Sequence, residues 1–156
     1  MNKKKGLTLL EILVVLTLML VLSSISLPKF REILKNMHLR NAASTLYGDL
    51  MFARVKAIEK KLPCGILFNL DANNYNVFCD NDNSGNYTDG DEILKNINID
   101  DDYDGVIIES TTNNPFLFGK RGFPQTLGNG KIILKMGNKS AQLIISSLGR
   151  IRVEFI

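Results

Sequence analysis

An acidic run at residues 80–91, DNDNSGNYTDGD, holds the residue types from which proteins build calcium loops. Four residues fall on the spacing of the calcium-loop pattern D-x-[DN]-x-[DN]-G, namely Asp80, Asp82, Ser84 and Gly85. Asn86 would then offer a carbonyl oxygen and Thr88 a water-mediated contact, while Asp91 stands where the pattern has a bidentate glutamate. Two interpretations stay open: a weak calcium site, and a solvated turn loop in which Asp, Asn and Gly serve backbone geometry.

Two cysteines, Cys64 and Cys79, lie on the two apolar runs that flank a loop of sequence DANN. If the two runs form a hairpin that pairs Asn69 with Asn74, the cysteines stand opposite each other, whereas a register shifted by one residue separates them. We favour a disulfide over two buried thiols, because the apolar N-terminal run at 7–27 predicts that this part of the chain lies outside the cytoplasm, in a compartment where disulfides persist. Two cysteines this far apart support neither a CxxC redox motif nor a zinc site.

The C-terminal part of the chain is basic and closes with GRIR at residues 149–152. Arg150 and Arg152 fall on one face of the expected strand, because side chains in a strand alternate with a period of two. Lys120 and Arg121 add positive charge nearby in the sequence. Such a surface could contact DNA phosphates. The alternative is that the arginines line a strand edge and keep it soluble.

An apolar run of 21 residues, 7–27, carries Glu11 as its single charge. A membrane-spanning helix needs about 20 such residues, and the sequence SSISLPKF that ends the run offers no signal-peptidase site. The lysines at positions 3–5 precede the run and account for all of the formal net charge of +3. The positive-inside tendency therefore predicts a cytoplasmic N-terminus and a head outside the membrane, from Pro28 onward.

Glu11 needs an explanation, because a carboxylate within lipid costs about 2.5–3.5 kcal/mol on insertion scales. One interpretation is that the side chain reaches the membrane interface. In the other, the chain is cut after Gly6, and the new α-amino group of Leu7 lies one helical turn before Glu11. A neighbouring helix could then present the same cation to the same anion and set the register between subunits.

The rest of the chain predicts an α+β fold. Apolar residues of segment 29–61 recur mostly every three or four positions, as in an amphipathic helix. An interior proline removes a backbone hydrogen bond, so we expect one long N-terminal helix with a kink at Pro28 and a transmembrane first half. Beyond Pro63, short β-like runs alternate with Asn, Asp and Gly clusters, which predicts a C-terminal antiparallel β-sheet packed against the helix. These runs are CGILFNL, YNVFC, GVIIES, FLFG, KIILKM, AQLIISS and RIRVEFI.

The N-terminal segment KKKG followed by LTLLEILVVL, with Pro28 at the end of the apolar run, resembles the signature of type IV prepilins. The resemblance implies that a prepilin peptidase cuts after Gly6 and that the new N-terminus, Leu7, is methylated. It also implies that Glu11 is the family's assembly glutamate and that Pro28 is its helix-kinking proline. Leu7 departs from the phenylalanine that is usual at this position.

Further segments narrow the resemblance to the GspH/FimT minor pseudopilins. AASTLYGDLMFARVKAIEKK, with its A-x-x-L and AR-x-x-A pattern, is similar to the family's helix segment, and YNVFCDNDNSGNYTDGDEIL and ISSLGRIRV also look like that family. The resemblance implies a type IV pilin-like fold and a structural subunit of a type II secretion pseudopilus or type IV pilus, placed near the tip. Its partners would be other pilins, through the N-terminal helix, and prepilin peptidase. The alternative is a DNA-binding minor pilin in DNA uptake, since FimT-like relatives carry a similar Gly-Arg-x-Arg.

The predicted organisation has three parts: a leader at 1–6, a transmembrane and assembly helix at 7–28, and an extracytoplasmic head at 29–156. The head divides into a helix, 29–61, and a mainly β part, 62–156. Before assembly the protein would lie in the bacterial inner membrane as a single-pass subunit. We expect no enzyme, because no nucleophile motif, phosphate-cradling glycine loop or isolated carboxylate pair is present, and His38 has no ligand or acid at a useful spacing.

Overall fold

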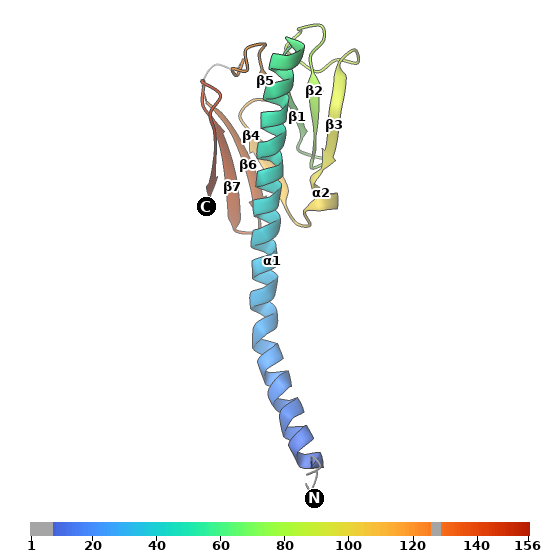
Figure 1. Cartoon of the computed structure of the whole chain (residues 1–156), viewed down its shortest axis with the longest axis vertical. Coiled ribbons are helices and arrows are strands. Elements are labelled where there is room, and N and C mark those ends of the chain that lie inside the picture. Colours follow the sequence, from blue (N-terminus) through green and yellow to red (C-terminus); the bar gives the residue numbers. More distant parts are fainter. Residues whose placement is uncertain (1–7, 126–128) are drawn as a thin grey trace, which may run out of the picture. The chain divides into compact units, whose positions relative to one another are not determined.

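The computed structural model describes residues 8–125 and 129–156, apart from the side chains of residues 25–28 and 31. The described residues divide into two units, one that ends at Asn36 and one that begins at Met37. A long helix comes first and strands follow it, as Figure 1 shows. The elements are α1 (Leu9–Lys60), β1 (Cys64–Asn69), β2 (Asn74–Cys79), β3 (Glu92–Asn98), α2 (Ile99–Asp102), β4 (Ile107–Thr111), β5 (Phe116–Phe118), β6 (Gly130–Met136), β7 (Lys139–Ile145) and β8 (Ile151–Phe155).

Helix α1 has recognisable signals at both ends. Thr8 precedes it, and the Thr8 hydroxyl oxygen accepts the backbone N–H of Glu11 at 3.2 Å, as in a capping box. At the other end Lys61 adopts a left-handed φ of 56°, and Pro63 follows. Pro28 lies within α1, and the kink expected there stays a prediction.

The membrane-spanning segment expected at 7–28 reaches beyond the residues whose side chains the structure describes. Among the described residues, no helix is both long and apolar enough to cross a membrane.

Within the described residues, eight strands form two antiparallel four-stranded sheets. The first sheet has the order β3-β2-β1-β5, and the second has the order β4-β6-β7-β8. The β1–β2 hairpin follows the DANN loop of the sequence, and β6 and β7 form a second hairpin. Asn73 and Gly137 adopt positive φ angles of 48° and 62° in these turns, a conformation that tight hairpin turns demand.

One face of α1 packs onto a core shared by both sheets. Its core residues recur every three or four positions and are at most 4% exposed: Leu39, Ala42, Ala43, Leu46, Leu50, Ala53 and Ala57. Four of them are alanines, whose small side chains let the helix approach the strands closely. The predicted amphipathic stripe is therefore confirmed in the second unit, except at Met37 and Ile58, which are 51% and 50% exposed.

The predicted strands were incomplete at β3. Its sequence, EILKNIN, lacks clear apolar alternation, and Ile93 is 46% exposed. The strand forms because β2 supplies a hydrogen-bonded partner in the register of Asn74 opposite Asn98. A bulge between Val77 and Phe78 breaks the period of two on which strand recognition depends.

Asn73 ties the first sheet to the second, a connection that the sequence analysis missed. Asn73 is buried, with an exposed fraction of 7%. Its amide donates to Asp100 at 2.6 Å and to the Val106 carbonyl at 2.8 Å, and its oxygen accepts the N–H of Ile108 at 2.8 Å. The turn between β1 and β2 is thereby bonded to the start of β4.

Candidate functional site

The N-terminal unit presents an apolar helix surface to solvent. Every large apolar side chain from Leu9 to Leu22 is at least 43% exposed, and Leu9 reaches 84%. A contiguous apolar surface of this kind marks a site of interaction with protein or membrane. The predicted cleavage and methylation positions, Gly6 and Leu7, lie outside the described residues.

Glu11 lies in the first turn at the start of this apolar surface. Its backbone N–H is held by Thr8, through both the carbonyl oxygen at 3.1 Å and the hydroxyl oxygen. A negative charge in the first turn interacts favourably with the helix dipole. Thr8 was missed in the sequence analysis, although the spacing T-L-L-E is the signal of a capping box.

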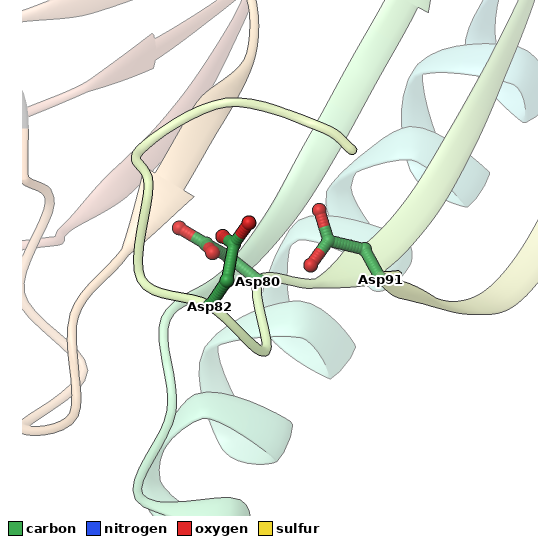
Figure 2. A group of neighbouring side chains, drawn as sticks. All are labelled: Asp80, Asp82 and Asp91. Carbon is green, nitrogen blue, oxygen red and sulfur yellow. The ribbon is translucent and has the colours of Figure 1, made fainter. Parts of the chain in front are cut away.

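The acidic run brings three carboxylates together, as Figure 2 shows. Oxygen atoms of Asp80, Asp82 and Asp91 all lie within 4.8 Å of one another. Asp80 is fully buried, Asp91 is half-buried and Asp82 is exposed. All three follow β2 or precede β3, so the strand pair fixes both ends of the loop.

Backbone N–H groups already bind each of these carboxylates. The N–H of Ser84 donates to Asp80 and to Asp82, each at 3.0 Å, and the N–H of Gly85 donates to Asp80 at 2.8 Å. Asp91 accepts from the N–H groups of Asn81 and Thr88 at 2.8 and 2.7 Å. Hydrogen bonds from Ser84 hold the pKa of Asp82 below its ordinary value, so this carboxyl is ionised at neutral pH.

The loop geometry is compatible with both interpretations of the sequence. Three carboxyl groups within one loop are the kind of oxygen ligand that suits a hard cation such as calcium. Of the other expected ligands, the Ser84 hydroxyl donates to the Asn86 carbonyl at 2.9 Å, so these two groups bind each other. The Thr88 hydroxyl donates to Asp82 and Asp91 at 3.2 and 3.3 Å. These hydrogen bonds within the loop are the ones expected of a turn loop whose polar groups bond to one another.

A disulfide joins Cys64 and Cys79 at the base of this loop. The β1–β2 ladder has Asn69 opposite Asn74 and Cys64 opposite Cys79, which is the register that the disulfide hypothesis required. Asp80 follows directly, and its N–H donates to the Pro63 carbonyl at 2.8 Å. The first carboxylate of the loop is thus attached to a cross-linked part of the sheet.

Arg54 of α1 forms a junction between two basic segments. Its guanidinium donates to the Gly149 carbonyl at 2.9 Å. A Cβ on Gly149 would lie 3.1 Å from the Gly122 carbonyl oxygen and 3.2 Å from Cζ of Arg54, so the two turns meet around this side chain. Gly122 and Gly149 have φ angles of 76° and 78°, which glycine adopts without strain.

This junction decides which of the predicted basic residues lie together. Lys120, Arg121 and Arg150 are exposed and flank the two glycines. Arg152 lies further along β8, where its guanidinium pairs with Glu154 at 3.0 Å. Three of the four residues predicted for phosphate contacts therefore adjoin two turns that meet, and the fourth is paired with a carboxylate.

A buried acid that the sequence analysis missed lies on α1. Asp49 is 3% exposed, accepts the Tyr75 hydroxyl at 2.8 Å and pairs with Lys95 at 2.7 Å. Burial, together with the neighbouring Asp49, raises the pKa of Tyr75 far above its ordinary value. The available signal was an acid among the core positions Leu46, Leu50 and Ala53 of the helix.

Comparison with known proteins follows the same division of the chain. Residues 42–149 match the family of the type II transport protein GspH, and residues 1–27 match the prokaryotic N-terminal methylation motif. The chain belongs to the GspH family. Among individual relatives, the pilin-like protein PilA1 of Thermus thermophilus is 30% identical over 156 residues, which cover 97% of this chain and 99% of PilA1.

Solved structures confirm the predicted type IV pilin-like fold of this GspH-family chain. The type IV minor pilin FimU of Pseudomonas aeruginosa superimposes with a TM-score of 0.59 at 18% identity, over 76% of this chain and 90% of FimU. The minor pseudopilin EpsH of Vibrio cholerae gives a TM-score of 0.56 at 12% identity, over 75% of this chain and 96% of EpsH. At these identities the likeness establishes the fold, an N-terminal helix packed on antiparallel sheets.

Proposed function

We propose that this GspH-family protein is a minor pilin or pseudopilin, a structural subunit of a type IV pilus or of a type II secretion pseudopilus. The observation that carries the proposal is one chain with an N-terminal methylation motif at 1–27, an exposed apolar helix and a GspH head. FimU and EpsH, a minor pilin and a minor pseudopilin, share its fold. Assembly, and not catalysis, is the activity that such an arrangement supports.

In this proposal the subunit is stored in the bacterial inner membrane and is then transferred into a fibre. The cytoplasmic leader is removed by prepilin peptidase after Gly6, and Leu7 is methylated. The apolar side chains from Leu9 to Leu22 exchange lipid for the helices of neighbouring pilins, so their large exposed area becomes buried. Glu11 pairs with the α-amino group of a neighbour. The head lies on the extracytoplasmic side and defines a position near the tip.

Two measurements on the full-length protein test the proposal. Intact mass after membrane extraction should show loss of residues 1–6 and addition of one methyl group. Glu11→Ala should still insert in the membrane, because removal of the acid lowers the cost of insertion, but it should be depleted from sheared fibres. Glu32→Ala, an acid on the same helix outside the apolar run, is the matched control and should assemble normally. An uncut leader in cells with active peptidase would contradict the proposal.

Calcium binding by the acidic loop forms a separate part of the proposal. Asp80, Asp82 and Asp91 would supply the charged ligands, and calcium would replace part of the hydrogen bonding that now holds the turn. The affinity should be weak, because the loop ends in the short side chain of Asp91. The role of a bound ion would be to fix the loop between β2 and β3, on an exposed part of the head.

A second candidate function is DNA binding, which the junction at Arg54 favours. The contact between the Gly122 and Gly149 turns supports this candidate, because Lys120, Arg121 and Arg150 adjoin the two glycines although they come from segments far apart in the sequence. Three exposed cations within one region can neutralise phosphates without reading sequence. In such a protein Arg54 would be a positioning residue. This convergence is the observation that supports the proposal, and salt-dependent binding of duplex DNA by the wild type and by Arg150→Gln tests it.

A further inference from the structure

Within the part of the chain that the structure describes, strand β8 forms the outer edge of the second sheet and leaves a defined set of its backbone groups unpaired. Ser140 and Ile156 exchange two hydrogen bonds of 2.8 Å, and the N–H of Ser146 donates to the Arg150 carbonyl at 2.9 Å. In an antiparallel ladder bonded pairs alternate with non-bonded pairs. The bonded residues of β8 are therefore the even-numbered ones. The odd-numbered residues Ile151, Val153 and Phe155 direct their N–H and C=O groups away from β7.

An apolar groove runs beside this edge. It has a volume of about 270 Å³ and is lined by Arg40, Ser44, Tyr47, Val153 and Phe155. Phe155 is 48% exposed and Tyr47 is 39% exposed. The Arg40 guanidinium lies over the Phe155 ring at 5.0 Å and closes one side. Free backbone groups next to an apolar groove are the two features by which a sheet edge accepts another strand.

The charged residues of β8 do not protect this edge. Arg152 and Glu154 pair with each other at 3.0 Å. Their side chains point to the face opposite that of Val153, because neighbouring residues of a strand alternate. Charges that block unwanted strand pairing normally point into the exposed edge. The groove side of β8 lacks such a charge at its centre among the described residues, and only Arg40 borders it.

The other end of the two-sheet head offers a complementary strand. Of the remaining sheet edges, β5 bridges to Pro124, and in β4 the N–H of Ile108 donates to the side chain of Asn73. Strand β3 forms the outer edge of the first sheet. Figure 1 shows β3 and the C-terminal strand at opposite sides of the head, with α1 between them.

The two outer edges also differ in charge. Exposed acids lie just after the end of β3, at Asp100 and Asp101, while Glu92 at its start and Lys95 within it are each held in an ion pair with α1. Arg40 and Arg150 are exposed beside β8. Opposite charges at the two edges favour the approach of β3 of one copy to β8 of another, whereas two copies of the same edge carry charges of the same sign and repel each other.

Helix α1 borders both edges. Lys60 pairs with Glu92, and Lys95 of β3 pairs with Asp49. On the other side, Arg40 lies against Phe155 of β8. A row of heads joined edge to edge would therefore keep every α1 on the same face of the joined sheets.

We propose that β8 is a docking edge for β3 of a second copy of this chain. The inference rests on the proposed role as a fibre subunit and adds the contact between heads. The extended β3 edge pairs with the outward-facing backbone groups of Ile151, Val153 and Phe155. Because the two surfaces differ, the contact is heterologous and need not close into a ring.

Cross-linking in the membranes of the host bacterium tests the contact. Two full-length copies with different tags carry Arg152→Cys and Asn96→Cys, which place exposed thiols on β8 and β3, while Cys64 and Cys79 are already joined. A short thiol cross-linker should give a dimer that contains both tags. Asn138→Cys, in the exposed β6–β7 turn, replaces Arg152→Cys as the control and should give no such dimer.

Variants of Val153 test the edge itself. Val153→Pro removes an N–H that points away from β7, and proline is tolerated where a strand N–H faces outward. The tagged dimer should be lost in this variant and kept in Val153→Thr, which retains both the N–H and the branched shape. Resistance of the head to protease should be unchanged in both. If Val153→Pro fails to fold, the cross-linking pair decides the proposal by itself.

Three results would overturn the inference. One is a fibre fraction that contains the chain but no cross-link between positions 96 and 152. The second is a cross-link only between two copies of position 152, which would mean a symmetric dimer. The third is a cross-link from position 152 to a different protein. Absence of the chain from fibres altogether would instead contradict the proposed function.

Discussion

Replacement of Tyr75 by phenylalanine measures how strongly the buried Asp49 network holds α1 on the first sheet. Both side chains are at most 3% exposed, and the hydroxyl donates to the carboxylate at 2.8 Å. Phenylalanine keeps the ring and its packing on Phe68, whose centroid lies 5.9 Å away. The variant therefore removes one hydrogen bond to a buried charge and little else.

The expected loss of unfolding free energy is about 1.5–3 kcal/mol, the usual contribution of a hydrogen bond to a charged group. For a chain of this size each kcal/mol lowers Tm by about 2–4 °C. Urea unfolding of the detergent-solubilised, disulfide-bonded chain, followed by circular dichroism, measures the change. Tyr103→Phe is the matched control, because its hydroxyl pairs with the neutral Thr45 hydroxyl at 2.6 Å. That variant should lose only about 0.5–1.5 kcal/mol.

The pH dependence gives a second readout for the same residue. The folded-state pKa of Tyr75 is raised, so this group contributes stability that is complete below the unfolded pKa of about 10 and decreases above it. Above about pH 10 the wild type should lose unfolding free energy faster than Tyr75→Phe, by up to about 1.4 kcal/mol per pH unit. Equal pH slopes, together with a loss no larger than that of Tyr103→Phe, would refute the reasoning.

Three further predictions concern the remaining sites. Asn73→Ala should lower the unfolding free energy by at least about 2 kcal/mol, because it leaves the buried Ile108 N–H and Val106 carbonyl without their partner. Asn73→Gly should recover about 1 kcal/mol of this loss because glycine suits the positive φ, and equal losses in the two variants would contradict this backbone contribution. Calorimetry should detect calcium binding with a dissociation constant of about 10⁻⁴–10⁻³ M, and this binding should be lost in Asp91→Asn and kept in Asp104→Asn. If millimolar calcium gives neither heat of binding nor a shift in Tm, the segment is a turn loop without a calcium site. Arg150→Gln should weaken binding to any duplex DNA and lower the salt slope by about 0.9 per lost contact, and the effect of Arg152→Gln should be smaller because Arg152 is paired with Glu154. The unfolding free energy should change by less than about 0.5 kcal/mol, and a wild type without salt-sensitive DNA binding would exclude this candidate function.

Features that depend on neighbouring residues could be predicted from the sequence. The helix boundary near Lys60, the turn between Asn69 and Asn74 and the position of Cys64 opposite Cys79 follow from local periodicity and turn chemistry. The N-terminal motif is also a local pattern, and the match at residues 1–27 confirms it. In each case the signal lies within a few residues of the feature that it indicates.

The tertiary structure alone decided the features that depend on distant partners. Strand β3 carries little apolar alternation and exists because β2 pairs with it. The division into two sheets, and the tie between them at Asn73, joins residues 33 to 35 positions apart. Asp49 is acceptable in the core only because Lys95, 46 residues later, neutralises it. Arg54 meets Gly149 across 95 residues and so gathers basic side chains that the sequence shows separately. Local pattern cannot specify such pairs, because the free energy that forms them comes from packing and hydrogen bonds completed only in the folded chain.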